Sequence, residues 1–200
     1  MKLAIASNNQ KKLKEIKSIL GGCFDELLSI KDLGLDIDIE GTGTTLLENA
    51  LIKARTIRDM TGMVALADDT GLMVDALDGA PGVYSARYAG EEHDDQKNNE
   101  KLLRELAGVP DEKRTAHFGT VIAVCFPDGT ELIAEGRVDG KIAFAPSGTT
   151  GFGYDPLFYC FDMGKMMAEG TLEEKNAVSH RGRALRNMLE VLKQHGTLLK

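Results

Sequence analysis

The sequence predicts a mixed α/β fold, a two-lobed mixed sheet flanked by helices. Strand-like and helix-like patterns alternate over the first half of the chain, which is typical of parallel strands joined by helices. Residues 115–144 instead hold adjoining runs of β-forming residues around a Pro-Asp-Gly-Thr turn, the pattern of an antiparallel hairpin. We therefore expect two lobes that share one long sheet, with residues 1–200 forming a single domain without a linker.

The first strand is predicted at residues 2–6, and a polar, basic loop at 7–12 follows it. A helix then buries Leu13, Ile16 and Leu20 on one face and stops at a Gly-Gly pair. The N–H groups and the dipole of such a helix N-terminus favour phosphate. The alternative is a solvated turn that caps the helix through Asn8 or Asn9, because the loop has no Walker or Rossmann glycine pattern.

Residues 35–40 alternate in polarity and predict a second strand with one polar face. Glu40 at its end is either a solvated acid or a metal ligand. Thr45 and Glu48 have the spacing of a capping box and predict the start of a helix with a purely structural apolar stripe. Gly62 follows the end of that helix.

The run 64–67 predicts a buried strand that ends on Asp68 and Asp69. Ionised carboxylates inside a fold need cations, donors or a metal, so a polar site is expected at this strand end. Thr70 and Gly71 predict a turn, and residues 72–77 predict a further strand. If one strand instead continued through both acids, they could not face the same phosphate, since side chains alternate between faces.

The second half of the chain predicts a helix from Asp94 and Asp95 to about residue 106, then the hairpin. Asp139-Gly140 predicts another turn after the return strand at 131–138. Residues 145–156 are rich in glycine around two aromatic residues and an acid, which indicates a shaped binding loop. A capping pattern at 171–174 and a last helix from about residue 180 complete the chain.

The composition is that of an ordinary soluble globular protein. A net charge of −7 argues against non-specific binding to a nucleic-acid backbone. Cys23, Cys125 and Cys160 form no CxxC pair, so we expect reduced thiols and neither a disulfide framework nor a zinc knuckle. With no apolar run long enough for a membrane span or signal peptide, we expect a cytoplasmic protein without a membrane partner.

Six short motifs together resemble one family, the pyrophosphatases of inosine and xanthosine triphosphates. Each motif is weak alone, but six in order along essentially the whole chain are specific. They are Ser7-x-Asn9-x-x-Lys12, Glu48-Asn49-Ala50-x-x-Lys53-Ala54, Ala67-Asp68-Asp69-Thr70-Gly71-Leu72, Ser85-Ala86-Arg87-Tyr88, Gly151-Phe152-Gly153-Tyr154-Asp155-Pro156 and Ser179-His180-Arg181-Gly182.

The resemblance implies a Mg²⁺-dependent homodimeric enzyme that hydrolyses ITP, dITP and XTP to the nucleoside monophosphate and pyrophosphate. It also implies that family's fold, with the nucleotide in a cleft between the lobes. Asp69 is implied as the catalytic residue, and Glu40 and Asp69 as metal ligands. The implied substrate-binding residues are Ser7, Asn8, Asn9, Gln10, Lys11, Lys12, Thr70, Phe152, Gly153, Tyr154, Asp155, Lys175, His180 and Arg181.

The chemistry of these residue types agrees with the resemblance. Lys11 and Lys12 offer the local positive charge that a triphosphate needs on an acidic protein. Arg181 or His180 can donate to the 6-oxo group of hypoxanthine or xanthine, and adenine would leave that donor unpaired. Phe152 can stack on the purine.

The sequence departs from the family at the phosphate loop: Ser7 replaces a frequent threonine, and Asn8 and Lys11 stand where glycine is often found. A pyrophosphatase of the dTTP or UTP type and a non-catalytic nucleotide sensor remain alternatives. A serine hydrolase built on Ser147 or Ser179 is excluded, because no GxSxG elbow surrounds either residue.

Overall fold

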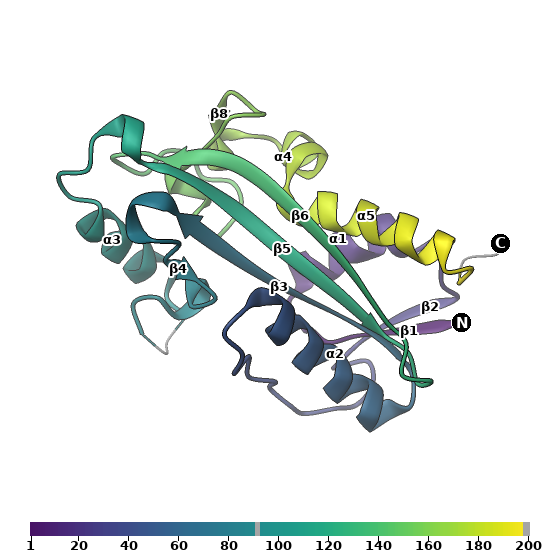
Figure 1. The fold of residues 1–200 in the computed structure, drawn as a ribbon. Coiled ribbons are helices and arrows are strands. Elements are labelled where there is room, and N and C mark those ends of the chain that lie inside the picture. The colour runs from purple at the N-terminus through teal and green to yellow at the C-terminus, as the bar shows by residue number, and fades with distance from the viewer. Residues whose placement is uncertain (91–92, 198–200) are drawn as a thin grey trace. The chain divides into compact units, whose positions relative to one another are not determined.

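The computed structural model describes residues 1–90 and 93–197 (Figure 1). It divides into two compact units, each built from segments that are distant in the sequence. Unit 1 comprises Met1–Asp69, Thr120–Gly136 and the chain from Gly182 onward; unit 2 comprises Thr70–Gly119 and Arg137–Arg181. The expectation of a two-lobed mixed α/β fold is confirmed.

The strands are hydrogen-bonded in the order β2-β1-β3-β5-β6-β7-β8, and β4 pairs with β3. The strands β1 and β2 run parallel, as do β1 and β3, whereas β6, β7 and β8 pair antiparallel. The elements are β1 (Lys2–Ile5), α1 (Gln10–Leu20), β2 (Glu26–Ser29), α2 (Leu46–Thr61), β3 (Val64–Val74), β4 (Pro81–Gly82), α3 (Asp95–Glu105), β5 (Thr115–Cys125), β6 (Glu131–Ile142), β7 (Phe158–Cys160), β8 (Lys165–Met166), α4 (Leu172–Val178) and α5 (His180–Gln194).

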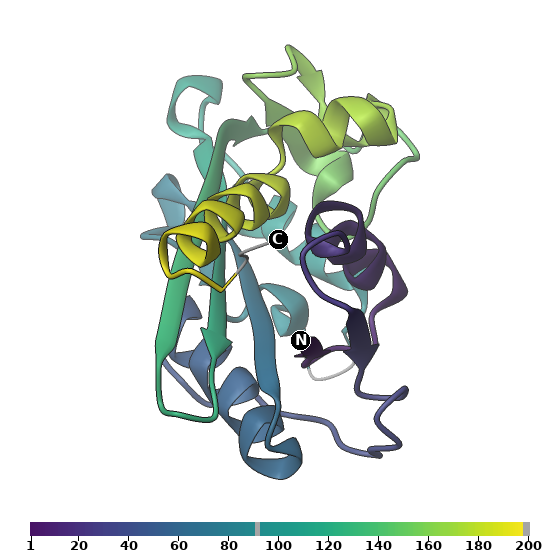
Figure 2. The same cartoon turned by 90° about the vertical axis from the view of Figure 1, so that its right-hand side faces the viewer.

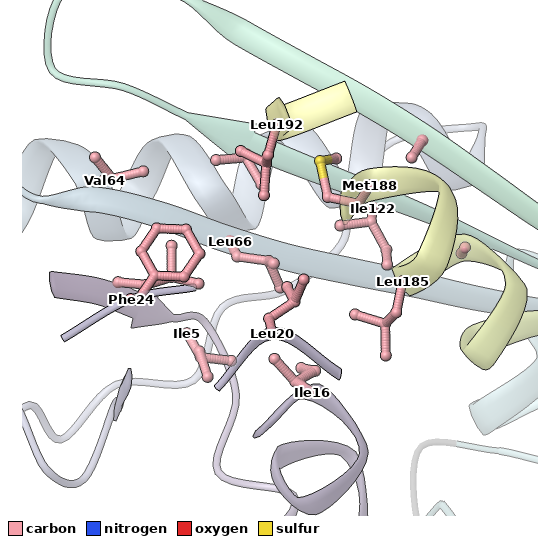
Figure 3. Close-up of a cluster of buried hydrophobic side chains, with 14 of the residues drawn as sticks. Ile5, Ile16, Leu20, Phe24, Val64, Leu66, Ile122, Leu185, Met188 and Leu192 are labelled. Atoms are coloured by element: carbon pink, nitrogen blue, oxygen red, sulfur yellow. The ribbon is translucent and has the colours of Figure 1, made fainter. Parts of the chain in front are cut away.

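In unit 1 the helices cover both faces of the sheet. Val64 and Leu66 of β3 pack in one core cluster with α1 and α5, as the close-up in Figure 3 shows. Ala65 and Ala67, one residue out of phase, pack in clusters that contain α2. Successive side chains of a strand point to opposite faces. Even-numbered residues of this half of β3 therefore face α1 and α5, and odd-numbered residues face α2 (Figure 1).

The predicted helix signals in unit 1 are present in the structure. Asn9 caps α1, and Thr45 caps α2 by accepting a hydrogen bond from the Glu48 N–H. Gly62 ends α2 in the left-handed conformation, with φ of 66°. In a complete capping box the Glu48 carboxylate would accept from the N–H of Thr45. Here it accepts from the Thr44 N–H instead, so the box is only half formed. This bond lowers the pKa of Glu48.

The hairpin of β5 and β6 continues the sheet beyond β3, and α5 lies along it (Figure 2). Ile122 and Val124 of β5 share a cluster with Leu185 and Met188 of α5. The last helix is thus placed by the apolar stripe that its sequence predicts.

Unit 2 has its own core, centred on Phe158 of β7. The rings of Phe118 and Phe158 lie 4.6 Å apart, and Leu72, Leu102 and Leu157 are completely buried around them. None of the helices in the part of the chain that the structure describes is long and apolar enough to cross a membrane.

The predicted strand at 35–40 is wrong: those residues form no strand, and β2 lies at Glu26–Ser29 instead. Alternation at 35–40 is nevertheless real, because Leu35, Ile37 and Ile39 pack half-buried against the cluster around Ile57. An alternating apolar pattern indicates that one face of a segment is buried. A strand also requires backbone hydrogen bonds to a neighbouring strand, which the pattern does not indicate. The four residues of β2 show no alternation and so gave no signal.

The predicted turn at Thr70-Gly71 is also wrong, because β3 runs unbroken from Val64 to Val74. Residues 75–77 form a 3₁₀ turn and not a strand. β3 lies between β1 and β5 in the sheet. β3 pairs with β1 at Val64–Leu66, before the Thr-Gly pair, and with β4 at Leu72 and Met73, after it, so tertiary pairing on either side of the pair favours a continuous strand over a turn. Both acids of this strand consequently belong to one continuous ladder.

The turn predicted at Asp139-Gly140 is likewise absent, since β6 continues to Ile142. Gly140 serves packing: a Cβ there would lie 2.1 Å from the Tyr159 carbonyl oxygen and 2.6 Å from the Phe158 ring. The glycine allows β7 to approach β6 closely.

We expect Gly140→Ala to lower the free energy of unfolding by about 1–3 kcal/mol, because the added methyl group meets backbone and a buried ring. Urea denaturation measures this loss. Gly22→Ala is the matched control, as a Cβ at Gly22 meets nothing within 4 Å. Equal stability of the two variants would contradict the packing role of Gly140.

Candidate active site

The polar side chains singled out from the sequence form two groups, one in each unit. The first, which we call the β3 charge group, consists of Asp68 and Asp69 of β3 with Lys12 and Lys53. The second, the loop 151–155 group, surrounds Phe152 in unit 2.

Asp68 faces α1, in register with Val64 and Leu66. It is only 4% exposed, and Lys12 of α1 places its Nζ 3.3 Å and 3.2 Å from the two carboxylate oxygens. A buried carboxylate needs such a partner, because desolvation of an unpaired charge is costly. Asp68 and Lys12 thus form a structural ion pair at the start of α1.

Asp69 faces α2, in register with Ala65 and Ala67. Lys53 of α2 donates from Nζ to Asp69 Oδ1 at 2.8 Å and to the Asp68 carbonyl oxygen at 3.1 Å. Asp69 is half-buried, so its carboxylate is both held in place and accessible. Because β3 continues through both acids, Asp68 and Asp69 point to opposite faces of the strand and contact different lysines.

Lys53 was counted in a motif, but no role was predicted for it. Its spacing in the sequence could nevertheless have indicated that Lys53 is partly buried and needs an acidic partner. Ala50, Lys53, Ala54 and Ile57 have i, i+3, i+4, i+7 spacing, so the lysine lies on the apolar face of α2. A cation on a buried face requires an anion opposite it, and the acids of β3 are the nearest candidates in the chain.

The polar loop at 7–12 is more self-contained than a phosphate cradle. Asn9 Oδ1 accepts from the N–H groups of Lys11 and Lys12, at 3.1 Å each, and Ser7 Oγ accepts from the Asn9 N–H. Asn8 Oδ1 accepts from the Lys31 N–H, which fixes the loop to the chain after β2. The alternative of a turn that caps the helix is therefore present in the structure.

These bonds limit how a phosphate can bind at the loop. Several backbone donors are already used, so binding would rely on the side chains of Ser7, Lys11 and Lys12 and on Gln10, whose Nε2 lies 3.4 Å from the Asn8 carbonyl. Lys11 is exposed at the surface and Lys12 is half-buried.

Glu40, the expected second metal ligand, is exposed in the irregular segment before α2. Among the described residues, no three His, Cys, Asp or Glu side chains are grouped so that they could hold a metal ion. Magnesium usually takes one or two carboxylates together with waters and substrate phosphates. Asp69 and Glu40 carry carboxylate oxygens of the type that Mg²⁺ prefers, and in the part of the chain that the structure describes they belong to no cage of protein ligands.

In unit 2, the loop at 151–155 is built around a buried ion pair. Asp155 Oδ2 accepts from Lys175 Nζ of α4 at 2.5 Å and from the Phe152 N–H at 3.1 Å. Gly151 covers this pair, since a Cβ there would lie 2.1 Å from Asp155 Oδ2. Lys175 Nζ also lies 4.9 Å from the centre of the Phe152 ring. Asp155 and Lys175 therefore shape the loop that carries Phe152.

The first residues of α5 bring two further predicted side chains to unit 2. Arg181 is 3% exposed, and its guanidinium lies 5.9 Å from the Phe152 ring centre. His180 stacks on Phe118, with ring centres 4.9 Å apart and planes 18° apart. A buried guanidinium beside an aromatic face can pair with a planar ligand that carries oxo groups.

The remaining predicted residues contribute mainly to structure. The Tyr154 hydroxyl donates to the Ser85 carbonyl oxygen at 2.6 Å, and burial raises the pKa of Tyr154, which keeps this donor protonated. Gly153 has φ of 61° and bonds to α3 through both of its backbone polar groups. Thr70 lies half-buried in β3, immediately after Asp69.

Comparison with known proteins decides the family. The profile of the Ham1 family matches residues 3–191 of this chain. The chain belongs to the Ham1 family. A solved Ham1 protein of Staphylococcus aureus superposes with a TM-score of 0.89 at 40% identity, covering 98% of this chain and 100% of that one.

The relatives of this chain include enzymes named for their activity. A dITP/XTP pyrophosphatase of Geobacter sulfurreducens is 53% identical over 97% of this chain and 96% of its own length. A dITP/XTP pyrophosphatase of Mycobacterium abscessus, known by crystal structure, has a TM-score of 0.80 at 46% identity, covering 94% and 99% of the two chains. The resemblance inferred from six motifs is thereby confirmed.

Proposed function

We propose that this protein hydrolyses ITP, dITP and XTP to the nucleoside monophosphate and pyrophosphate. The single observation that carries the proposal is Asp69: a half-buried carboxylate on β3, held by Lys53, in a chain of the Ham1 family. Relatives about half identical over nearly their full length are named dITP/XTP pyrophosphatases.

The triphosphate end requires positive charge and donors. Lys12 already lies beside Asp68, and Lys11 is exposed on the same turn of α1. Ser7 and Gln10 add a hydroxyl and an amide. These side chains bind the β- and γ-phosphates, while the Asn9 cap keeps the turn in shape.

The chemical step needs a base beside the α-phosphorus. Asp69 takes a proton from a water molecule as the water oxygen forms its bond to the α-phosphorus. The bond from the α-phosphorus to the α,β-bridging oxygen breaks, and that oxygen leaves with pyrophosphate. Lys53 holds Asp69 in one orientation through Oδ1. A magnesium ion at Asp69 and Glu40, when bound, supplies neutralisation of phosphate charge.

Base selection resides in unit 2. Phe152 stacks on the purine, and Arg181 donates to the 6-oxo oxygen of hypoxanthine or xanthine. Adenine carries an amino donor at that position and so offers the buried guanidinium no acceptor there. His180 lies on the adjoining aromatic stack with Phe118 and adds a second polar group.

We further propose that the enzyme works as a homodimer in the cytoplasm with Mg²⁺ as cofactor. The three free cysteines suit a reducing compartment. The family resemblance supports the dimer and the metal.

The test is product analysis with ITP, with and without Mg²⁺. We expect IMP and pyrophosphate in equal amounts with the metal, and negligible turnover when EDTA removes it. Release of IDP and phosphate would contradict the proposed bond. Tight ITP binding without turnover would favour the nucleotide sensor instead, and turnover confined to dTTP or UTP would favour the other pyrophosphatase type.

A further inference from the structure

The loop that carries Phe152 is attached to α3 by hydrogen bonds to the backbone of one residue, Gly153. Asp95 Oδ2 accepts a hydrogen bond from the Gly153 N–H at 2.9 Å, and Asn99 Nδ2 donates to the Gly153 carbonyl oxygen at 3.0 Å. We call Asp95 and Asn99 the α3 clamp. It satisfies both backbone polar groups of the residue next to Phe152.

The clamp follows from helix geometry. Asp95 and Asn99 are four residues apart, so their side chains lie on the same face of α3, one turn from each other. The Asp95 carboxylate accepts a hydrogen bond and the Asn99 amide group donates one. The two side chains therefore match the N–H donor and the C=O acceptor of Gly153. Gly153 adopts φ of 61°, where glycine is favoured.

The helix that bears the clamp is itself firmly placed. Asn98 accepts from the Ala89 N–H at 2.8 Å and donates to the Ala86 carbonyl oxygen at 2.9 Å. Leu102 of α3 and Leu106, which caps its C-terminus, are completely buried in the unit 2 core. The clamp therefore connects a rigid element to the loop.

The loop is held on its other side as well. The N–H groups of Thr149 and Thr150 donate to the Ala168 carbonyl oxygen at 3.0 Å and 2.9 Å. Asp155 Oδ2 also accepts from the Phe152 N–H, at 3.1 Å. Phe152 lies between these anchors in the chain, so the orientation of the peptide group between Phe152 and Gly153, and with it the direction in which the Phe152 side chain leaves the backbone, depends on the clamp.

We propose that Asp95 and Asn99 are positioning residues for base recognition: they set the orientation of Phe152 against the purine without touching it. The inference rests on the proposed role of Phe152 in base stacking. Correct placement of a stacking ring is a condition for aligning the 6-oxo group with Arg181. Loss of the clamp should weaken recognition of the base and leave phosphate binding intact.

The test compares two competitive inhibitors of ITP hydrolysis, inosine for the base end and inorganic triphosphate for the phosphate end. We expect Asp95→Ala and Asn99→Asp each to raise the inhibition constant of inosine about tenfold, the effect of losing one charge-assisted or polar bond. The inhibition constant of inorganic triphosphate should stay unchanged. Asn99→Asp is the sharper variant, because it places a carboxylate against a carbonyl oxygen.

Two control variants separate positioning from general damage. Asp95→Asn keeps an acceptor for the Gly153 N–H and should retain inosine binding close to that of the parent protein. Gln96→Ala changes an exposed neighbour on the same helix and should also have no effect.

Equal weakening of inosine and inorganic triphosphate, or no weakening of either, would overturn the inference. Phe152→Ala distinguishes the two possible failures. If Phe152→Ala weakens inosine binding but the clamp variants do not, the clamp inference alone fails. If Phe152→Ala leaves inosine binding unchanged, the proposed base site fails and the inference fails with it.

Discussion

Asp69→Asn is expected to reduce kcat for ITP by roughly 10²- to 10⁴-fold, the usual contribution of a positioned general base. The asparagine keeps an oxygen that can accept from Lys53 Nζ, so β3 and α2 should remain packed as before. What disappears is the basic oxygen that takes the proton and the charge available to a metal ion. Steady-state release of pyrophosphate at saturating Mg²⁺ measures the loss.

Asp36→Asn is the control for Asp69→Asn, because it removes one exposed carboxylate from the same unit. It should retain full activity. The circular-dichroism spectrum of the Asp69 variant should match that of the parent protein. Near-normal pyrophosphate release from a well-folded Asp69→Asn protein would contradict the catalytic assignment.

Arg181→Ala is expected to erode discrimination between ITP and ATP by about ten- to a hundredfold. The guanidinium is almost completely buried beside Phe152, and the 6-oxo group of hypoxanthine offers it an acceptor where adenine presents a second donor. Removing the guanidinium removes the hydrogen bond that favours the oxo group and the desolvation cost that disfavours the amino group. That desolvation cost is on the order of 1–3 kcal/mol. The ratio of kcat/KM for the two nucleotides is the measurement.

Arg186→Ala, an exposed arginine on the same helix, is the matched control and should leave that ratio unchanged. If Arg181→Ala lowered kcat/KM for ITP and ATP by the same factor, the residue would serve binding in general and not base choice.

The helices and the hairpin were predictable because their signals are local. The caps of α1, α2, α3 and α4 and the apolar stripe of α5 agree with the structure. The failures came where tertiary pairing decides. β3 runs through Thr70-Gly71 despite these turn-forming residues, and it pairs with β1 before them and with β4 after them. β6 runs through Asp139-Gly140, where Gly140 pairs with Cys160 of β7.

The candidate site was predicted through motifs more than through geometry. The two acids of β3 were identified from a buried strand that ends in carboxylates, but their lysine partners require knowledge of which helix covers which face. No role is predicted for Lys53 from the sequence for that reason. The same holds for the α3 clamp, whose residues contact a loop more than fifty positions away in the sequence.

A competition assay tests the central claim most directly. Equal concentrations of ITP, XTP, ATP, dTTP and UTP are incubated with the protein and Mg²⁺, and each monophosphate is followed together with pyrophosphate. We predict that IMP and XMP accumulate with matching pyrophosphate while the other three nucleotides remain largely intact. Formation of AMP at the rate of IMP, or release of phosphate in place of pyrophosphate, would contradict the account.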